Sequence, residues 1–197
     1  MEFDAKQRKE YIVLQAVTLI SEKGINHVST KEIAKRLNIS EGLIFKLFPR
    51  KSDIILAVLE HLSIYDKDMY ITALDKNENA YDAICFYINS FMIYYENYPE
   101  ITAVNMAYDS LRGDPILEQK ASSIFQNRIY YLSQLLDKAR AESETWGTLP
   151  SEDFAIMILS TIRGMCLKWR LENYGFLLRE RTMAAILRIL EGLKPVT

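Results

Sequence analysis

The chain has 197 residues, a nearly even balance of 24 basic and 26 acidic residues, and a hydrophobic share of 49%. No apolar run approaches the roughly 18 residues that suggest a membrane helix, and the mixed-charge N-terminus leads into no signal-peptide core. Only 7 Gly and 5 Pro interrupt the chain, which favours long helices over many short strands. We therefore expect an all-α cytoplasmic protein of about nine helices, without membrane contact.

The first predicted helix covers residues 4–23. Ile12, Ala16 and Leu19 recur on one stripe at helical spacing, as in a helix with one buried face. Gly24 follows directly, and glycine is suited to a left-handed cap at a helix C-terminus. The helix should therefore end at this residue.

Two short helices are predicted next, over residues 30–37 and 41–47. Ser29 and Glu32 have the spacing of a capping box. Asn38 tolerates the left-handed conformation that a sharp turn between the helices needs. The apolar residues that would hold the two helices crossed are Ile33, Ala34, Leu37, Ile39, Ile44, Leu47 and Phe48. Such a pair is a helix-turn-helix, although any three-helix bundle can carry the same pattern.

Longer helices are predicted for the rest of the chain. Asp114 and Pro115 form a strong start signal, since Asp caps a helix and Pro suits its first position. A loop is expected over residues 146–150. The predicted helices cover residues 52–74, 80–97, 99–112, 115–144, 151–173 and 178–193.

Charge is distributed unevenly along the chain. Residues 1–56 carry ten Lys and Arg against seven Asp and Glu, a net charge of +3, whereas the remainder has a net charge of −5. A solvated helix surface can produce such an excess. Under a helix-turn-helix, however, it also suits contact with a nucleic acid.

The segment from residue 16 to residue 53 resembles the N-terminal signature of the TetR family of bacterial repressors. The residues that carry the resemblance are Ala16-Val17, Gly24, STKEIA at 29–34 and NISEGLIFKLFPRKSD at 38–53. The resemblance implies a three-helix DNA-binding head over residues 1–50. It further implies a multi-helix domain for effector binding and dimerisation over residues 51–197.

The resemblance also implies which residues contact DNA. Side chains at the start of the second helix and Lys51 would hold phosphates, while those of the third helix would enter the major groove. The predicted DNA-binding residues are Ser29, Thr30, Lys31, Ser40, Glu41, Gly42, Leu43, Phe45, Lys46 and Lys51. Leu43 replaces a usual hydroxyl residue, and Phe45 and Leu47 replace frequent tyrosines. We expect Leu43 and Phe45 to contact thymine methyl groups instead, unless the head binds DNA weakly.

The helix over residues 151–173 is apolar on two faces. Phe154, Ile158, Thr161, Ile162, Met165 and Trp169 form one stripe. By the resemblance, the second stripe and the last helix form a four-helix dimer interface. Its predicted members are Ile156, Leu159, Ser160, Arg163, Gly164, Leu167, Met183, Ile186, Leu187 and Leu190. Because one short recognition helix covers few base pairs, we expect a homodimer on a palindromic operator.

Aromatic and Met side chains are abundant between residues 86 and 169. Core packing explains each one singly, whereas the resemblance implies that some line an effector pocket. The predicted pocket residues are Phe86, Asn89, Phe91, Tyr94, Asn105, Met106, Phe125, Gln126, Ile129, Met157 and Trp169, with Arg128 as a further polar anchor. The ligand would be mostly apolar: an acyl chain, a lipid-like metabolite or an aromatic xenobiotic.

The sequence gives no support for a catalytic function. His27 and His61 lack a neighbouring nucleophile or metal ligand, Cys85 and Cys166 form no paired motif, and no Gly-rich phosphate loop occurs. We therefore expect a ligand-responsive repressor with no enzyme activity, metal or cofactor. The alternatives are a dimeric interaction protein that has lost DNA binding and a DNA-binding dimer without an effector.

Overall fold

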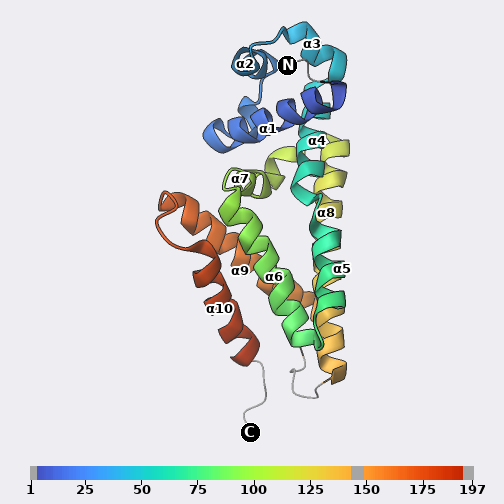
Figure 1. The fold of residues 1–197 in the computed structure, drawn as a ribbon, viewed down its shortest axis with the longest axis vertical. Helices are drawn as coiled ribbons and strands as arrows, with labels where there is room; N and C mark the ends of the chain where they lie inside the picture. Colours follow the sequence, from blue (N-terminus) through green and yellow to red (C-terminus); the bar gives the residue numbers. More distant parts are fainter. Residues whose placement is uncertain (1–3, 143–148, 193–197) are drawn as a thin grey trace. The chain divides into compact units, whose positions relative to one another are not determined.

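The computed structural model describes residues 4–142 and 149–192. Over these residues every regular element is a helix, which confirms the predicted all-α class. The chain forms two compact units, whose course Figure 1 shows. Unit 1 comprises Met1–Ile64 and Pro99–Ile124, and unit 2 comprises Tyr65–Tyr98 and Phe125–Thr197. The functional division at residue 50 stays a prediction, because these units are defined by packing.

Unit 1 is organised around helix α1. Ile12, Ala16 and Leu19 are fully buried, as the stripe predicts. Gly24 ends the helix with a φ of 86° and an extended ψ of 159°, so its positive φ is not a left-handed helical cap. Helix α1 packs against α2, α3, α4 and α7. The elements of unit 1 are α1 (Ala5–Lys23), η1 (Ile25–His27), α2 (Thr30–Leu37), α3 (Glu41–Leu47), α4 (Lys51–Ser63), α7 (Ile101–Met106), η2 (Tyr108–Leu111) and the start of α8 (Pro115–Glu142).

Unit 2 is organised around helix α6, which lies between α5 and α10 in Figure 1 and packs against both. Tyr87, Ile88, Met92 and Tyr95 of α6 are each at most 1% exposed, so this helix supplies much of the core. Helix α9 packs against α10. The elements of unit 2 are α5 (Asp66–Lys76), α6 (Ala80–Asn97), the later part of α8, α9 (Ser151–Leu171) and α10 (Leu178–Gly192).

One predicted helix is in fact two. The chain expected to be helical over residues 52–74 forms α4 and α5, separated by Ile64 and Tyr65. Both residues keep right-handed helical dihedral angles, so the break requires no Gly or Pro and leaves no breaker signal in the sequence. Asp66 then begins α5 with its carboxylate bound to Arg128. A tertiary contact therefore accompanies the start of the new helix.

The other helix ends agree closely with the sequence. The prediction over residues 99–112 becomes α7 followed by the 3₁₀ helix η2, while α2, α3 and α6 have the predicted bounds. The predicted ends at residues 144 and 193, and most of the loop over 146–150, lie outside the described residues. Among the helices described, none combines the length and hydropathy of a membrane-spanning segment.

Candidate functional site

The helix-turn-helix of unit 1 consists of α2, a short turn and α3. Asn38 adopts the left-handed conformation in the turn, with φ 53° and ψ 46°, as predicted. The backbone N–H of Ile39 donates to the carbonyl of Ala34 at 3.0 Å and closes the turn. Ile33, Ala34, Ile44 and Phe48 are buried beneath it. Four of the seven predicted core positions are therefore buried, while Leu37, Ile39 and Leu47 are only half-buried.

Serine hydroxyls cap both helices of this motif. Ser29 Oγ accepts from the N–H of Glu32 at 3.4 Å, and Ser40 Oγ accepts from the N–H of Leu43 at 3.2 Å. Only the serine half of the predicted capping box forms. The Glu32 carboxylate turns instead toward Arg36, because a cation at the next helical turn is within its reach.

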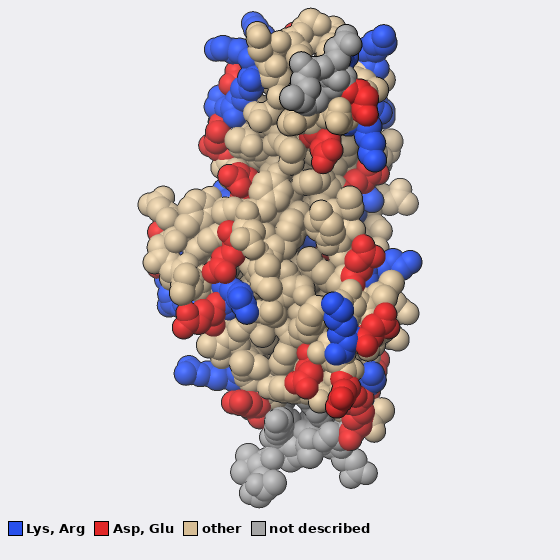
Figure 2. Space-filling view, in the orientation of Figure 1, with Lys and Arg blue, Asp and Glu red and all other residues tan. Residues whose placement is uncertain are grey.

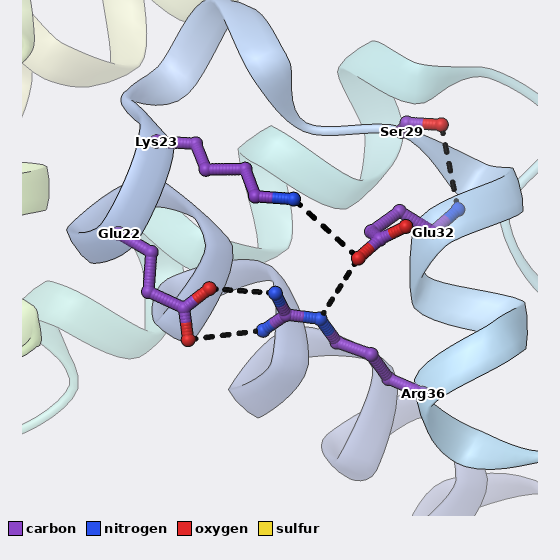
Figure 3. A network of polar contacts seen from close by, with 5 residues as sticks. All are labelled: Glu22, Lys23, Ser29, Glu32 and Arg36. Carbon is purple, nitrogen blue, oxygen red and sulfur yellow. Dashed lines mark hydrogen bonds and ion pairs between the residues drawn. The ribbon is translucent and has the colours of Figure 1, made fainter.

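An ion network joins the end of α1 to α2, as Figure 3 shows. The Arg36 guanidinium donates to the two carboxylate oxygens of Glu22 at 2.6 and 3.2 Å and to Glu32 Oε1 at 3.4 Å. Lys23 Nζ lies 3.5 Å from the same oxygen of Glu32. The hydrogen bonds from Arg36 are the main cause that lowers the pKa of Glu22 and Glu32. Because water reaches this network, it orients α2 on α1 and adds little stability.

Helix α3 turns one face toward the core and the other toward solvent. Ile44 is fully buried, whereas the next side chain, Phe45, is 47% exposed. Of the predicted groove residues, Ser40, Gly42, Phe45 and Lys46 are exposed, and Glu41 and Leu43 are half-buried. Helix α3 thus has both the buried face and the solvent-exposed face that the sequence predicts. Its contact with DNA stays a prediction.

Charged side chains of both signs lie along the two sides of the α1–α3 region on the face shown in Figure 2. Lys23, Arg36 and Arg50 are paired with carboxylates. Lys31 and Lys46 are exposed and form no ion pair within the described part of the chain. Within the described residues of this region, cations without an ion pair therefore lie on α2 and α3, where the sequence predicts DNA contacts, and also on α1 at Lys6 and Arg8.

The start of α2 is tied to the start of α3. Thr30 Oγ1 donates a short hydrogen bond to Glu41 Oε1. Ser29 and Thr30 are half-buried at this end of α2. Lys51, the predicted phosphate contact of α4, donates from Nζ to the Asn26 carbonyl at 3.0 Å and stays exposed. These bonds fix the spacing of the groups expected to face a DNA backbone.

Unit 2 encloses a buried ion pair between α5 and α8. Arg128 Nε and Nη2 donate to the two carboxylate oxygens of Asp66 at 2.6 and 3.0 Å, and the residues are 4% and 5% exposed. Arg128 Nη1 donates to Tyr95 Oη at 3.3 Å, and the guanidinium carbon lies 4.9 Å from the centre of the Phe91 ring. Desolvation raises the pKa of Asp66, although Arg128 acts in the opposite direction.

Two tyrosine hydroxyls of α6 accompany this pair. Tyr87 Oη and Tyr94 Oη are buried and have no hydrogen-bond partner within the described residues. The Tyr87 ring centre lies 5.1 Å from the centre of the Phe91 ring, which faces the Arg128 guanidinium. The Tyr94 ring centre lies 5.8 Å from that of Tyr95, the hydrogen-bond partner of Arg128. Burial raises the pKa of both tyrosines, so each remains a neutral donor. An unsatisfied buried hydroxyl costs about 1–3 kcal/mol, which a hydrogen-bond acceptor would relieve.

The predicted effector residues lie in several places. Phe91 and Tyr94 belong to the buried cluster just described, while Asn105 and Met106 lie in α7 of unit 1. Phe86 of α6 and Phe125 of α8 are half-buried in unit 2, and Met157 of α9 is 46% exposed. Trp169 is buried and donates from Nε1 to the Phe176 carbonyl at 2.9 Å.

Two surface hollows of unit 2 hold the remaining predicted effector residues. Asn89 lines a groove of about 570 Å³ between α6 and α10, where it accepts a hydrogen bond from Arg179 at 2.7 Å. Gln126 and Ile129 line a hollow of about 430 Å³ beside the start of α9. The two hollows have separate linings, so Asn89 lines a different hollow from Gln126 and Ile129. Which of these places binds an effector stays a prediction.

Comparison with known proteins identifies the head. Residues 12–58 match the family model described as bacterial regulatory proteins of the tetR family. This chain belongs to the TetR family. The matched residues include α2, the turn and α3. The family signature thus coincides with the helix-turn-helix whose geometry is described above.

Relatives of this TetR-family chain extend beyond the head. It is 22% identical over 172 residues to the nucleoid occlusion factor SlmA of Glaesserella parasuis, covering 87% of this chain and 85% of the relative. A TetR-family regulator from Agrobacterium tumefaciens is 19% identical, with a TM-score of 0.82 and coverage of 98% and 100%. The regulator FadR from Bacillus subtilis, solved with stearoyl-CoA, is 20% identical, with a TM-score of 0.79 and coverage of 93% and 98%. The family model describes bacterial regulatory proteins, and these two regulators share the fold of this chain.

The TetR-family interface predicted on α9 and α10 divides into two groups. Leu167 is 48% exposed and Ser160 and Gly164 are exposed, while Ile156, Leu159, Arg163, Met183 and Leu187 are half-buried. Ile186 and Leu190 are fully buried within the subunit, so their placement at the interface is wrong. The reason is helical phase: residues 186 and 190 face the core, whereas residues 183 and 187 line the groove beside α6.

Asp66 and Tyr87 are members of the polar cluster that the sequence did not indicate. Asp66 and Asp68 look alike within one expected helix, although only Asp66 is buried. Tyr87 resembles any core aromatic. A buried ion pair depends on which turns of distant helices face each other, and one sequence carries no sign of that. Arg128 alone was singled out, as a candidate polar anchor.

Proposed function

We propose that this TetR-family regulator is a cytoplasmic homodimeric repressor that binds palindromic operator DNA and is released by a mostly apolar small molecule. The observation that carries the proposal is the exposure of the outer face of α3 while Ile44 anchors the helix in the core. Reading a base sequence requires side chains that reach base edges from a rigidly held helix. The division into a DNA-binding head over residues 1–50 and a regulatory domain over 51–197 follows from the same proposal.

The chemistry of α3 suits readout of the major groove. Glu41 can accept from a cytosine amine, Lys46 can donate to guanine, and Leu43 and Phe45 offer apolar contact to thymine methyl groups. Around them, the Ser29–Thr30 end of α2 presents backbone N–H groups to phosphate, and the lysines at 31 and 51 add positive charge. Phosphate contacts position the head, and α3 supplies specificity.

A second copy of the chain is needed for specificity, because one α3 covers only a few base pairs. Two heads read half-sites one helical turn of DNA apart, roughly 34–36 Å. The surface residues of the α9 stripe, with Leu167 the most exposed of its large apolar members, support a dimer through this face. The interface we propose is formed by Ile156, Leu159, Ser160, Arg163, Gly164, Leu167, Met183 and Leu187.

The ligand releases the protein from DNA because it binds one of two arrangements of the heads more tightly than the other. A ligand that binds better to the arrangement unable to span adjacent half-sites shifts the population away from DNA, by no more than that difference allows. The stearoyl-CoA bound to FadR, which shares the fold, supports an acyl-type or similarly apolar effector. The candidate places in this chain are the buried cluster and the two hollows of unit 2.

The test is selection of bound fragments from genomic DNA, followed by fluorescence anisotropy on the recovered site. We expect a dimer that neutralises about eight phosphates to show a log–log salt slope of about −7. Lys46→Ala should weaken binding, while Lys76→Ala in α5, which removes the same charge, should not. Absence of salt-sensitive binding to any fragment would overturn the proposal.

Exposed apolar side chains on α3 favour a second candidate, a dimeric interaction protein with lost DNA binding. Phe45 is 47% exposed and Leu43 stands beside it. The same selection separates the candidates, since an interaction protein recovers no DNA. A regulator without an effector would bind DNA yet show no thermal shift with acyl-CoAs, fatty acids or dyes.

A further inference from the structure

The buried Asp66–Arg128 cluster lies next to the points where the chain passes between the two units. The chain crosses after Ile64, after Tyr98 and after Ile124. Asp66 follows the first crossing by two residues, Tyr94 and Tyr95 shortly precede the second, and Arg128 follows the third by four. The ion pair and the Arg128–Tyr95 hydrogen bond therefore join all three connecting segments inside unit 2.

The cluster has an excess of hydrogen-bond donors. Tyr87 Oη and Tyr94 Oη are buried without partners among the described residues, and their raised pKa keeps both protonated. A cationic ligand would bind over the face of an aromatic ring such as Phe91. The Arg128 guanidinium already occupies that position, 4.9 Å from the Phe91 ring centre. The complementary ligand group is therefore an anionic oxygen acceptor. A flat two-oxygen group matches the guanidinium, which binds Asp66 in that manner.

We propose that this cluster binds the carboxylate of an apolar acid, which replaces Asp66 on Arg128 and accepts hydrogen bonds from Tyr87 and Tyr94. The inference deepens the proposed function, on which it rests, by naming the effector class. Asp66 acts as a built-in competitor that occupies the site until an acid displaces it. Displacement frees the start of α5, two residues from the segment that leads to α4 and the head.

Replacement of the Asp66 carboxylate by the ligand carboxylate on Arg128 should be accompanied by uptake of a proton. The charged and titratable groups facing the cluster are Arg128 and Tyr131 from α8, Tyr87, Tyr94 and Tyr95 from α6, Tyr98 directly after α6 and Tyr65 directly before α5. Only Arg128 among them carries positive charge, and the ligand takes its place beside that charge. The displaced Asp66 carboxylate then lacks a cation and takes up one proton from solvent. Affinity should consequently rise as the pH falls from about 8 to about 6, while the ligand acid itself stays ionised.

The test compares three probes with one apolar chain in isothermal titration of the full-length protein. Dodecanoate, dodecanol and dodecyltrimethylammonium are each kept below the critical micelle concentration. We expect dodecanoate to bind at least about tenfold more tightly than dodecanol, because Arg128 and both tyrosines meet an acceptor only in the acid. Titration in two buffers of different ionisation enthalpy should show uptake of about one proton per dodecanoate.

Variants assign the effect to the cluster. Arg128→Gln should remove the preference for the acid, and Tyr87→Phe with Tyr94→Phe should weaken dodecanoate about five- to tenfold. Asp66→Asn removes the competing charge and keeps an acceptor for Arg128, so it should tighten dodecanoate binding. Tyr130→Phe, on an α8 tyrosine that is 57% exposed, is the matched control and should change nothing. Circular dichroism of each variant checks that it is folded.

The outcomes separate this inference from the proposed function. Equal binding of acid and alcohol, absence of binding by all three probes, or unchanged affinity in Asp66→Asn would overturn the carboxylate site. DNA binding is measured in parallel by anisotropy. Salt-sensitive DNA binding without acid preference leaves the regulator standing and removes the site, whereas acid preference without DNA binding removes the regulator and keeps the site.

Discussion

The two units each contain an arginine that binds carboxylates with two or more nitrogens, and the two arginines have opposite surroundings. In unit 1, Arg36 bonds Glu22 and Glu32 at the surface, and its hydrogen bonds lower the pKa of both acids. In unit 2, Arg128 bonds Asp66 in the core, yet desolvation raises the pKa of that acid. The arginine thus lowers the pKa of its acid in both units, and only in the core does desolvation outweigh this effect.

The difference shows what each pairing is suited to do. At the surface, water already solvates both ions, so their attraction gives little net stability and serves mainly orientation. In the interior, the charges have lost their water, and their attraction must offset that loss before it stabilises anything. A buried pair is therefore weak evidence for stability, and strong evidence that its partners depend on each other. Such dependence is what a ligand-controlled contact requires.

The largest expected effect is on the buried pair. Asp66→Ala removes the carboxylate that binds Arg128 and leaves the guanidinium charge buried, which should lower the free energy of unfolding by about 3–5 kcal/mol. Urea denaturation followed by circular dichroism measures the loss. A change below about 1 kcal/mol would show that Arg128 finds compensation elsewhere.

Replacing both partners sharpens this prediction. Asp66→Leu together with Arg128→Met fills the same region with apolar side chains and leaves no orphaned charge. Stability should return to the wild-type value or exceed it, since apolar replacements of buried pairs are often neutral or stabilising. A double variant as unstable as Asp66→Ala would show that the pair itself stabilises unit 2, against the comparison drawn above.

A much smaller effect is expected at the surface network. Arg36→Ala removes the hydrogen bonds to Glu22 and Glu32, but water takes the place of the guanidinium. The urea midpoint should fall by several-fold less than in Asp66→Ala. Lys35→Ala, which removes a neighbouring exposed charge of the same helix, is the control for the loss of a cation. A fall as large as that of Asp66→Ala would contradict the contrast.

The smallest effects are the pH dependences, which should have opposite signs. Glu22 has a folded pKa below its ordinary value of 4.5, so its contribution is present above that pH and is lost as the pH falls through the lowered pKa. Asp66 has a raised folded pKa, so the wild type should gain stability relative to Asp66→Asn as the pH falls. Urea midpoints of wild type, Glu22→Gln and Asp66→Asn from about pH 7 to pH 4 test both signs. Slopes of the same sign would contradict the account.

The sequence predicts the helix-turn-helix head better than the buried Asp66–Arg128 cluster, because the head is formed by local contacts and the cluster by distant ones. The head is local: its caps, the turn at Asn38 and the core positions of α2 and α3 lie within 20 residues of chain. Both serine caps, the turn and four of the seven predicted core positions appear where expected. The buried cluster is non-local, because Asp66 and Arg128 are 62 residues apart in sequence. Helical periodicity places each on a face but does not say which faces meet.

Helix phase explains the remaining differences. Heptad-like spacing on α10 grouped Met183, Ile186, Leu187 and Leu190 together, although two of them point into the core and two toward a groove. The break between α4 and α5 escaped notice because Ile64 and Tyr65 keep helical dihedral angles. Patterns of apolar residues predict that a face is buried, and only the packed structure tells whether the subunit itself covers it.

The central claim, that α3 reads bases while α2 holds the backbone, is tested most directly by selecting operator sequences with matched lysine variants. Lys46→Ala in α3 and Lys31→Ala in α2 remove the same charge from neighbouring helices. The account predicts that Lys46→Ala relaxes the preferred base at one position of each half-site by about 1–3 kcal/mol, while Lys31→Ala weakens every sequence alike. Identical base preferences in wild type and both variants, with only uniform weakening, would contradict it.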